Sequence, residues 1–296
     1  MPKHSSTVSL VLGSGGARGL AHIGIIREFE DSGYKIASIA GASAGALVGG
    51  IHAAGKLDEF TDWISAVSKA DIVNLLDIAW EKNGLVKGDK VIQTLKELVG
   101  DQRIEDLPIP FTAVATDIKR QKEVWLNTGS LFDAIRASIS LPFFFTPVSL
   151  NGAILIDGGV LNPVPIAPTF NDDTDLIVAV NLSGPPVEDP DALLADADTE
   201  KQQSQSFFNR KLSEFIEDLS QSMQDSTSEL DMYDIGNQAF DAMQGTIARQ
   251  KLAAYPPDHT IEIPRNACKL LDFDRAAAMI RLGRERARRL LDGMTA

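Results

Sequence analysis

The feature of this sequence that most limits its fold is the repeated alternation of short apolar runs with helical patterns over the first 184 residues. Ser9–Leu12 is apolar and ends in glycines, which predicts a buried strand, and apolar residues then recur at helical spacing from Leu20 to Phe29. Ile36–Ala40 predicts a second strand, and a helix of small residues follows over Ala44–Ala54. Further strands are predicted over Phe111–Thr116, Val124–Leu126, Ile154–Ile156 and Leu176–Asn181.

Strands that alternate with helices pair in parallel, because a parallel pair needs a long crossover connection and a helix supplies it. Right-handed crossovers follow from the twist of the strands, and we expect helices on both faces of the sheet. The sequence therefore predicts the α/β class, with three layers (α/β/α) and a mostly parallel central sheet.

The composition changes after the last of these strands, where Pro185, Pro186 and Pro190 mark a break. We expect residues 7–184 to form the core that carries the motifs described below. We expect residues 246–296 to add a C-terminal strand and helix to the same domain.

The segment between them, residues 185–245, carries 14 acidic and 3 basic residues. Within it, Phe208–Met223 places apolar residues on one helical face, which predicts a helix packed on the core; the alternatives are a mobile lid and a dimer helix. Cys268–Leu291 is another helical pattern, rich in basic residues, and we expect it to lie against the acidic segment.

The composition argues against several classes of protein. The net charge of −13 argues against a nucleic-acid partner, because binding a phosphate backbone requires basic side chains. Cys268 is the only cysteine, so we expect no internal disulfide, and no Cys/His spacing indicates a metal site. The sequence has neither a leader pattern nor about twenty consecutive uncharged apolar residues, and we expect a cytoplasmic protein.

The strongest local motif is Gly41–Gly45 (GASAG), a G-x-S-x-G sequence between a predicted strand and a predicted helix. In a nucleophile elbow, a sharp turn projects the serine hydroxyl above the sheet, and small neighbours allow the chain to pack closely. The adjacent helix N-terminus favours developing negative charge. Ser43 is thus a candidate nucleophile; the alternative is an ordinary helix cap.

A second motif, Gly13–Gly19 (GSGGARG), lies at the turn between the first predicted strand and the first helix. Consecutive glycines let several backbone amides point at one anion. A Walker loop would need a lysine before a serine or threonine, and a dinucleotide fingerprint would need glycine where Arg18 stands. An oxyanion hole needs only the amides, and the elbow would supply its nucleophile.

A third motif, Asp157-Gly158-Gly159, directly follows a predicted strand. A carboxylate at the carboxyl end of a strand lies where open α/β sheets place their sites. The alternative is a turn aspartate, because Asp-Gly is a common turn pair. The proline-containing run Asn162–Pro165 that follows would hold such a carboxylate in place.

The sequence offers few histidines as a catalytic base: His4, His22, His52 and His259. His22 lies in the first helix, where a packed or capping role is commoner, and only His259 gives the chain order of an α/β-hydrolase triad. The simpler arrangement is a dyad in which Asp157 accepts the proton of Ser43. The pKa of an aspartate side chain in water is about 3.9, so we expect burial to raise it here.

Together, these three motifs resemble those of the patatin-like phospholipase family, and the chain is most similar to its compact bacterial members. The likeness covers residues 7–183 and includes the segment Ala137–Pro142; Ser14 stands where the family has glycine. The resemblance implies Ser43 as nucleophile and Asp157 as base. It further implies that the amides of Gly15, Gly16 and Ala17 are the oxyanion donors. Arg18 would contact substrate phosphate or fix the loop. The motif glycines would be Gly41, Gly45, Gly158 and Gly159.

The expected function is a serine acyl hydrolase that cleaves fatty-acyl esters of lipids, phospholipids or lysophospholipids without a metal or other cofactor. The acyl chain would lie among Leu141 and Phe143–Phe145, which otherwise pack in the core. Peripheral contact with the inner membrane surface and a homodimer are expected. The alternatives are a non-catalytic lipid-binding scaffold of the same fold and an esterase that uses His259.

Overall fold

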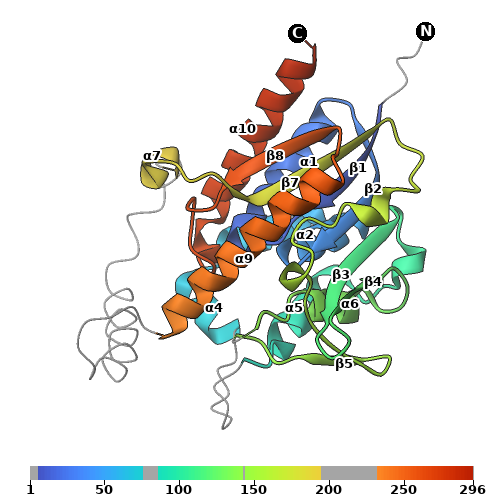
Figure 1. Ribbon diagram of the computed structural model, residues 1–296, viewed down its shortest axis with the longest axis vertical. Helices are drawn as coiled ribbons and strands as arrows, with labels where there is room; N and C mark the ends of the chain where they lie inside the picture. The colour runs from blue at the N-terminus through green and yellow to red at the C-terminus, as the bar shows by residue number, and fades with distance from the viewer. Residues whose placement is uncertain (1–5, 76–85, 143, 195–231, 296) are drawn as a thin grey trace.

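The computed structural model describes residues 6–75, 86–142, 144–194 and 232–295. Within them, an eight-stranded mixed sheet is flanked by helices on both faces, which confirms the predicted three-layer α/β/α class (Figure 1). The strands are β1 (Thr7–Leu12), β2 (Lys35–Ala42), β3 (Phe111–Asp117), β4 (Lys122–Leu126), β5 (Val148–Leu150), β6 (Ala153–Asp157), β7 (Leu176–Gly184) and β8 (His259–Pro264). The helices of the core are α1 (Ala21–Asp31), α2 (Ala44–Ala53), α3 (Leu57–Ala66), α4 (Lys69–Leu75), α5 (Asp89–Val99) and α6 (Leu131–Ser138).

The strand order is β5-β6-β3-β2-β1-β7-β8, and β4 also pairs with β3. The five strands β3, β2, β1, β7 and β8 are mutually parallel. The strands β4 and β6 each pair antiparallel with β3, and β5 pairs antiparallel with β6. A tight turn after Asp117 joins β3 to β4 directly, without a crossover helix. The carboxyl ends of β1 and β2 thus lie side by side, and the loops that follow them meet at one edge of the sheet.

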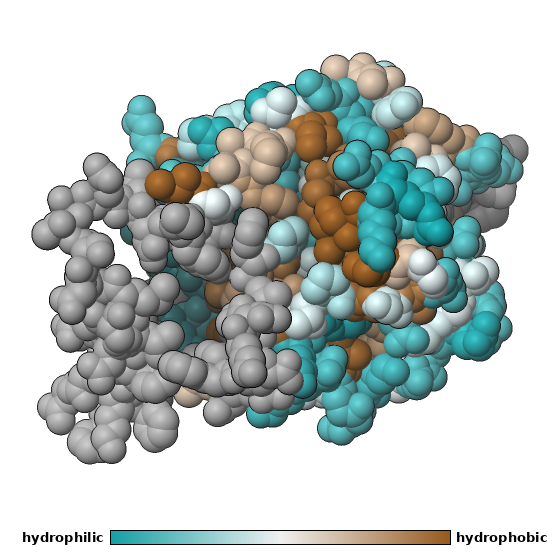
Figure 2. All heavy atoms as spheres, turned by 60° about the horizontal axis from the view of Figure 1, so that its bottom comes forward, coloured by the Kyte–Doolittle hydropathy of each residue, from teal (hydrophilic) through white to brown (hydrophobic). Residues whose placement is uncertain are grey.

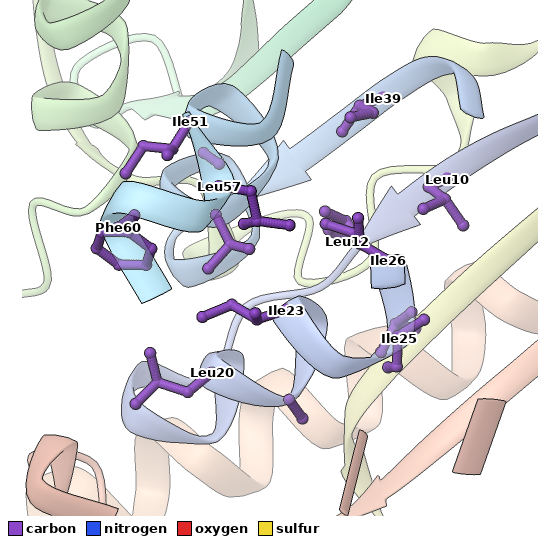
Figure 3. Close-up of a cluster of buried hydrophobic side chains, with 14 of the residues drawn as sticks. Leu10, Leu12, Leu20, Ile23, Ile25, Ile26, Ile39, Ile51, Leu57 and Phe60 are labelled. Carbon is purple, nitrogen blue, oxygen red and sulfur yellow. The ribbon is translucent and has the colours of Figure 1, made fainter. Parts of the chain in front are cut away.

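Alternation along β1 divides the core between the two faces of the sheet. Leu10 and Leu12 belong to the large apolar cluster with α1 and α2, and much of it is visible in Figure 3. Val11 points to the other face, where it joins a smaller cluster with Ala248 of helix α9 (Met232–Ala254). Each fully buried leucine or isoleucine contributes about 1.5–3 kcal/mol, so the large cluster fixes the position of the motif-bearing loops.

The C-terminal helix α10 (Ala276–Thr295) begins later than predicted. Cys268–Asp272 forms a turn in which the Asp272 carboxylate accepts the Lys269 amide at 2.9 Å, and the short helix η6 (Phe273–Arg275) follows. A side-chain acceptor of this kind competes with helical hydrogen bonds, which explains the later start.

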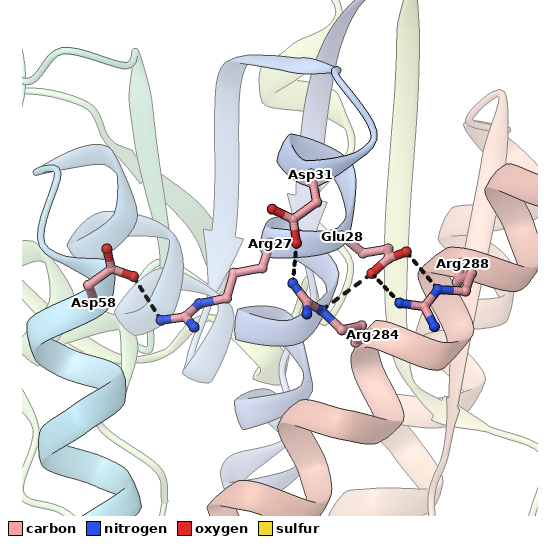
Figure 4. A network of polar contacts seen from close by, with 6 residues as sticks. All are labelled: Arg27, Glu28, Asp31, Asp58, Arg284 and Arg288. Carbon is pink, nitrogen blue, oxygen red and sulfur yellow. Dashed lines mark hydrogen bonds and ion pairs between the residues drawn. The ribbon is translucent and has the colours of Figure 1, made fainter.

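The helix α10 packs along α1, which the sequence analysis did not foresee; because residues 195–231 lie outside the described residues, its packing against the acidic segment as a whole stays a prediction. Glu28 and Asp31 of α1 pair with Arg284 and Arg288 of α10 (Figure 4). Among the described residues, this region also touches the acidic segment: Arg275, just before α10, pairs with Asp191 at 3.3 Å, and Arg281 of α10 donates to the Leu194 carbonyl at 3.0 Å. Close packing of the two helices, rather than the overall charge of distant segments, decides this arrangement.

Of the acidic segment, the structure describes residues 185–194, with α7 (Pro190–Leu194), and the beginning of α9. The predicted helix Phe208–Met223 lies outside the described residues, so its role as packed helix, lid or dimer helix stays a prediction. No helix in the described ranges is both long and apolar enough to cross a bilayer.

Candidate active site

Ser43 occupies the sharp turn between β2 and α2. Its backbone is in an unusual conformation, with φ 55° and ψ −121°, which a residue adopts only when the surrounding structure holds it there. Gly45 allows α2 to begin directly on β1, because a Cβ at this position would lie 2.0 Å from the Leu12 carbonyl oxygen. The turn thus has the geometry of a nucleophile elbow.

Asp157 ends β6 and faces Ser43. The Ser43 hydroxyl donates a hydrogen bond of 2.6 Å to Asp157 Oδ2, and the Gly159 amide donates to Oδ1 at 2.7 Å. The carboxyl group is fully buried, and this burial raises its pKa to about 7, although both hydrogen bonds act in the opposite direction. A carboxylate with such a pKa can accept a proton near neutral pH, which an ordinary aspartate does poorly.

Two backbone amides of the glycine loop have no hydrogen-bond partner among the described residues. The amides of Gly13 and Ser14 donate to other backbone carbonyls, and the Ala17 amide donates to the Leu270 carbonyl at 2.9 Å. Ala17 as a third oxyanion donor therefore stays a prediction, and in this conformation its amide proton is already shared with the Leu270 carbonyl. Within the described ranges, the amides of Gly15 and Gly16 bond to no other group, and both residues line the same cavity as Ser43.

Arg18 does not face this cavity. Its side chain is buried, and its guanidinium donates to the Arg265 carbonyl and to Asp241 at 3.4 Å. These contacts tie the glycine loop to two C-terminal segments. Of the two roles that the sequence suggested for Arg18, this geometry favours fixing the loop.

A deep cavity opens at Ser43 and runs between α3, α4 and α5. It holds about 1040 Å³ of empty space, including the part open to solvent. Its lining is almost entirely apolar, with the side chains of Ser14, Ser43 and Gln244 as the polar exceptions beside the Trp63 indole. The apolar lining includes Leu20, Phe60, Ile64, Val67, Leu95, Leu141, Phe144 and Phe145.

The cavity is therefore suited to a long hydrocarbon chain. Leu141, Phe144 and Phe145 line it, as the acyl-pocket hypothesis expected, while Phe143 lies outside the described residues. Part of the remaining wall comes from α3 and the residue that follows it, Val67, and the sequence analysis did not single these residues out. The spacing of Phe60, Ile64 and Val67 is a helical signal that could have identified this wall.

Ser138 is another residue that sequence reasoning missed. Its hydroxyl accepts the Ser43 amide at 2.9 Å and donates to the Val114 carbonyl at 2.6 Å, so it ties the elbow to β3. The neighbouring Ser140 carbonyl accepts the Asp157 amide at 2.9 Å. The only sequence signal was the place of both serines in the Ala137–Pro142 segment.

The placements of His22 and His259 do not support a role as catalytic base, and His4 lies outside the described residues. His22 is buried, bonds to the Gly13 carbonyl at 2.9 Å and has a pKa that burial lowers to about 4, which fits a packing role. His259 begins β8, whereas Ser43 follows the carboxyl end of β2, three strands away in the sheet. That separation is roughly 14 Å across the strands alone, so the placement gives no support to a triad with His259. Among the described residues, no group of three or more His, Cys, Asp or Glu side chains could hold a metal.

Comparisons with known proteins show what the chain is similar to. The sequence model of the family described as patatin-like phospholipase matches residues 10–170. The chain is 37% identical to an uncharacterized NTE family protein of Mycobacterium tuberculosis, over 97% of this chain and 92% of that protein. It is 31% identical to the lysophospholipase NTE1 of Yarrowia lipolytica, over 59% of this chain and 12% of that much longer protein. Among solved structures, VipD from Legionella pneumophila covers 99% of this chain and 67% of its own, with a TM-score of 0.49 and 14% identity.

Proposed function

Because the chain belongs to the patatin-like phospholipase family, we propose that it hydrolyses fatty-acyl esters of lipids with Ser43 as nucleophile and Asp157 as base. The observation that carries this proposal is the 2.6 Å hydrogen bond between the two side chains, beside an apolar cavity that Ser43 lines. Lysophospholipids are the favoured substrate class, since one relative is named a lysophospholipase and the cavity has an apolar lining that suits an acyl chain.

In the first half of the reaction, Ser43 Oγ attacks the ester carbonyl carbon while its proton moves to Asp157. The negative charge that develops on the carbonyl oxygen is stabilised by the Gly15 and Gly16 amides and by the N-terminus of α2. Collapse of this tetrahedral intermediate breaks the bond to the alcohol, which leaves with the proton from Asp157. The product is an acyl group on Ser43.

In the second half, water attacks the acyl carbon and gives its proton to Asp157. A second tetrahedral intermediate then breaks the bond to Ser43 Oγ, which takes back the proton. The fatty acid is released and both side chains return to their starting state. Burial of Asp157 supports this cycle, because its raised pKa allows the carboxyl group to accept and donate a proton near pH 7.

Two substitutions test the proposal. Ser43→Ala removes the nucleophile and Asp157→Asn removes the base, and each is expected to lower kcat for lysophosphatidylcholine and for a p-nitrophenyl acyl ester by about a thousandfold or more. His259→Ala is the matched control and is expected to keep near-normal rates. Turnover that survives in either site variant, with the thermal unfolding temperature unchanged, would contradict the dyad.

Covalent labelling separates the enzyme from a non-catalytic lipid-binding scaffold. A fluorophosphonate probe is expected to label the wild-type protein at Ser43 and to leave Ser43→Ala unlabelled. A wild-type protein that binds fatty acid but neither reacts with the probe nor turns over an ester would be a scaffold, and the hydrolase proposal would fail.

A further inference from the structure

Gln244 is a buried polar residue that the reaction described above does not use. It lies on α9, outside the residues 10–170 that match the family, yet it lines the same cavity as Ser43. Its exposed fraction is 3%, which is rare for a glutamine. A buried amide is costly unless its polar atoms are bonded, so its contacts indicate what it does.

The first contact is with the glycine loop. Gln244 Nε2 donates a hydrogen bond of 3.1 Å to the hydroxyl of Ser14, the residue directly before Gly15. The Ser14 amide is itself bonded to the Pro163 carbonyl at 2.8 Å. Backbone and side chain of Ser14 are therefore both held, and the position of the Gly15 amide follows from them. Ser14 stands where the family has glycine, so this bond depends on a residue that departs from the motif.

The second contact is with the turn that holds the base. A Cβ on Gly159 would lie 2.3 Å from Gln244 Nε2 and 2.3 Å from Ser14 Oγ. Both polar atoms thus lie directly against the Gly159 backbone. The Gly159 amide donates a hydrogen bond of 2.7 Å to Asp157 Oδ1. The pair of Gln244 and Ser14 lies between the oxyanion loop and the Asp157 turn.

The helix α9 holds the loop at a further point. Asp241, one turn before Gln244, pairs at 3.4 Å with Arg18, which follows Gly15 and Gly16 in the loop. The two free amides therefore lie between two positions that α9 holds, one on each side. Helix α9 is anchored in turn through Ala248, which packs in the smaller apolar cluster under the sheet.

We propose that Gln244 is a positioning residue, which acts through Ser14 to hold the oxyanion amides and the Asp157 turn in their reactive spacing. This inference rests on the proposed hydrolase function and adds a residue to it. Gln244 is expected to affect the transition state more than substrate binding, because amide donors stabilise an oxyanion only when they are well placed before the reaction. The apolar cavity that holds the acyl chain is unchanged by the loss of this bond.

A double-mutant cycle tests the inference. Gln244→Leu keeps the bulk of the side chain and removes the bond, and Ser14→Ala removes only its hydroxyl partner. Each is expected to lower kcat for lysophosphatidylcholine about tenfold with KM within about twofold of wild type, the size expected for one well-placed hydrogen bond. The double variant is expected to lose no more than either single variant, since both remove the same bond.

The rate of fluorophosphonate labelling provides a second readout, because phosphonylation of Ser43 uses the same oxyanion donors; it is expected to fall in parallel with kcat. Gln250→Leu is the matched control, since Gln250 makes the same substitution possible on the same helix but is exposed and does not line the cavity. It is expected to retain the wild-type kcat.

Three results would overturn the inference: wild-type kcat in Gln244→Leu, losses that add in the double variant, or a loss confined to KM. If thermal unfolding shows that Gln244→Leu does not fold, Ser14→Ala alone tests the inference. It must again lower kcat while KM stays near the wild-type value. The failure of the hydrolase proposal is distinguishable, because there the wild-type protein itself shows neither labelling nor turnover. Normal wild-type turnover with an unaffected Gln244→Leu variant removes the positioning role alone.

Discussion

At the scale of single residues, the burial of Asp157 explains how a carboxylate could serve where serine hydrolases usually employ histidine. The side chain is fully buried between β3, the glycine loop and the elbow, so its charged form loses contact with water. Its two hydrogen bonds, from Ser43 and Gly159, keep it oriented. Basicity and orientation thus come from the same environment.

This environment predicts the pH dependence of the reaction. Asp157 must be ionised to accept the Ser43 proton, and its pKa is raised to about 7. We therefore expect kcat/KM to fall about tenfold per pH unit below pH 7 and to level off above it. The measurement is fatty-acid release between pH 5 and 9. A rate that stays constant down to pH 5 would show that the base has an ordinary carboxyl pKa.

Residue-scale prediction from the sequence succeeded where a motif dictates local backbone geometry. The elbow and the Asp157 turn could be predicted because each needs particular small residues at fixed spacing. The sequence could not show that the Ala17 amide is bonded to Leu270, a residue more than two hundred positions later. Ser138 and Gln244 were missed for the same reason, since a hydrogen bond between distant segments leaves no local pattern.

At the scale of secondary-structure elements, the packing of α10 on α1 joins the C-terminus to the beginning of the chain. The two helices approach closely at Gly24, where a Cβ would lie 1.9 Å from the Ile280 carbonyl oxygen. Beside this contact, the buried carboxylate of Glu28 pairs with Arg284 at 3.3 Å and with Arg288 at 2.9 Å. Close backbone packing and an ionic contact thus fix one interface, and Figure 4 shows the ionic contact.

Glu28→Gln tests the ionic part of this interface. The substitution leaves two arginines without their shared carboxylate at a site where Glu28 is only 7% exposed, and we expect unfolding to become easier by about 1–3 kcal/mol. Asp58→Asn is the matched control, because Asp58 pairs with Arg27 at 2.8 Å but is largely exposed. It is expected to cost less than about 1 kcal/mol. Equal losses in urea unfolding would contradict the assignment.

The strands could largely be predicted from sequence, whereas the helices α3 to α6 and α9 were not among the predicted elements. Every predicted strand is present with slightly wider bounds, because a buried strand leaves a continuous apolar run. The short strand β5 was missed, since Val148–Leu150 has too few residues to show alternation. The start of α10 was placed too early because periodicity does not reveal the Asp272 turn.

At the scale of the whole molecule, charge and apolar exposure set how the protein would meet a lipid surface. The net charge is −13. Large exposed apolar side chains in the described residues are Ile118, Trp125, Phe170, Ile235, Met243 and Tyr255. Figure 2 shows one face of the molecule, where apolar residues lie among polar ones. Peripheral membrane contact stays a proposal, and it would depend on apolar insertion rather than on charge attraction.

Vesicle composition tests this proposal. An acidic protein is repelled by an anionic surface, so hydrolysis of lysophospholipid carried in neutral phosphatidylcholine vesicles is expected to be faster than in anionic phosphatidylglycerol vesicles. Added salt is expected to reduce the difference, because the Debye length falls from about 10 Å at 0.1 M to about 3 Å at 1 M. The readout is the initial rate of fatty-acid release. Faster hydrolysis on anionic vesicles at low salt would contradict membrane contact by apolar insertion.

The bond between the Ala17 amide and the Leu270 carbonyl has a consequence for anyone who shortens this chain. Leu270 and Gln244 both lie beyond residue 170, where the family match ends, yet both touch the glycine loop or the cavity. A fragment trimmed to the matched region would keep Ser43 and Asp157 but lose the groups that shape the loop beside them. Transplanting this chemistry into another scaffold therefore requires the C-terminal segments as well as the three motifs.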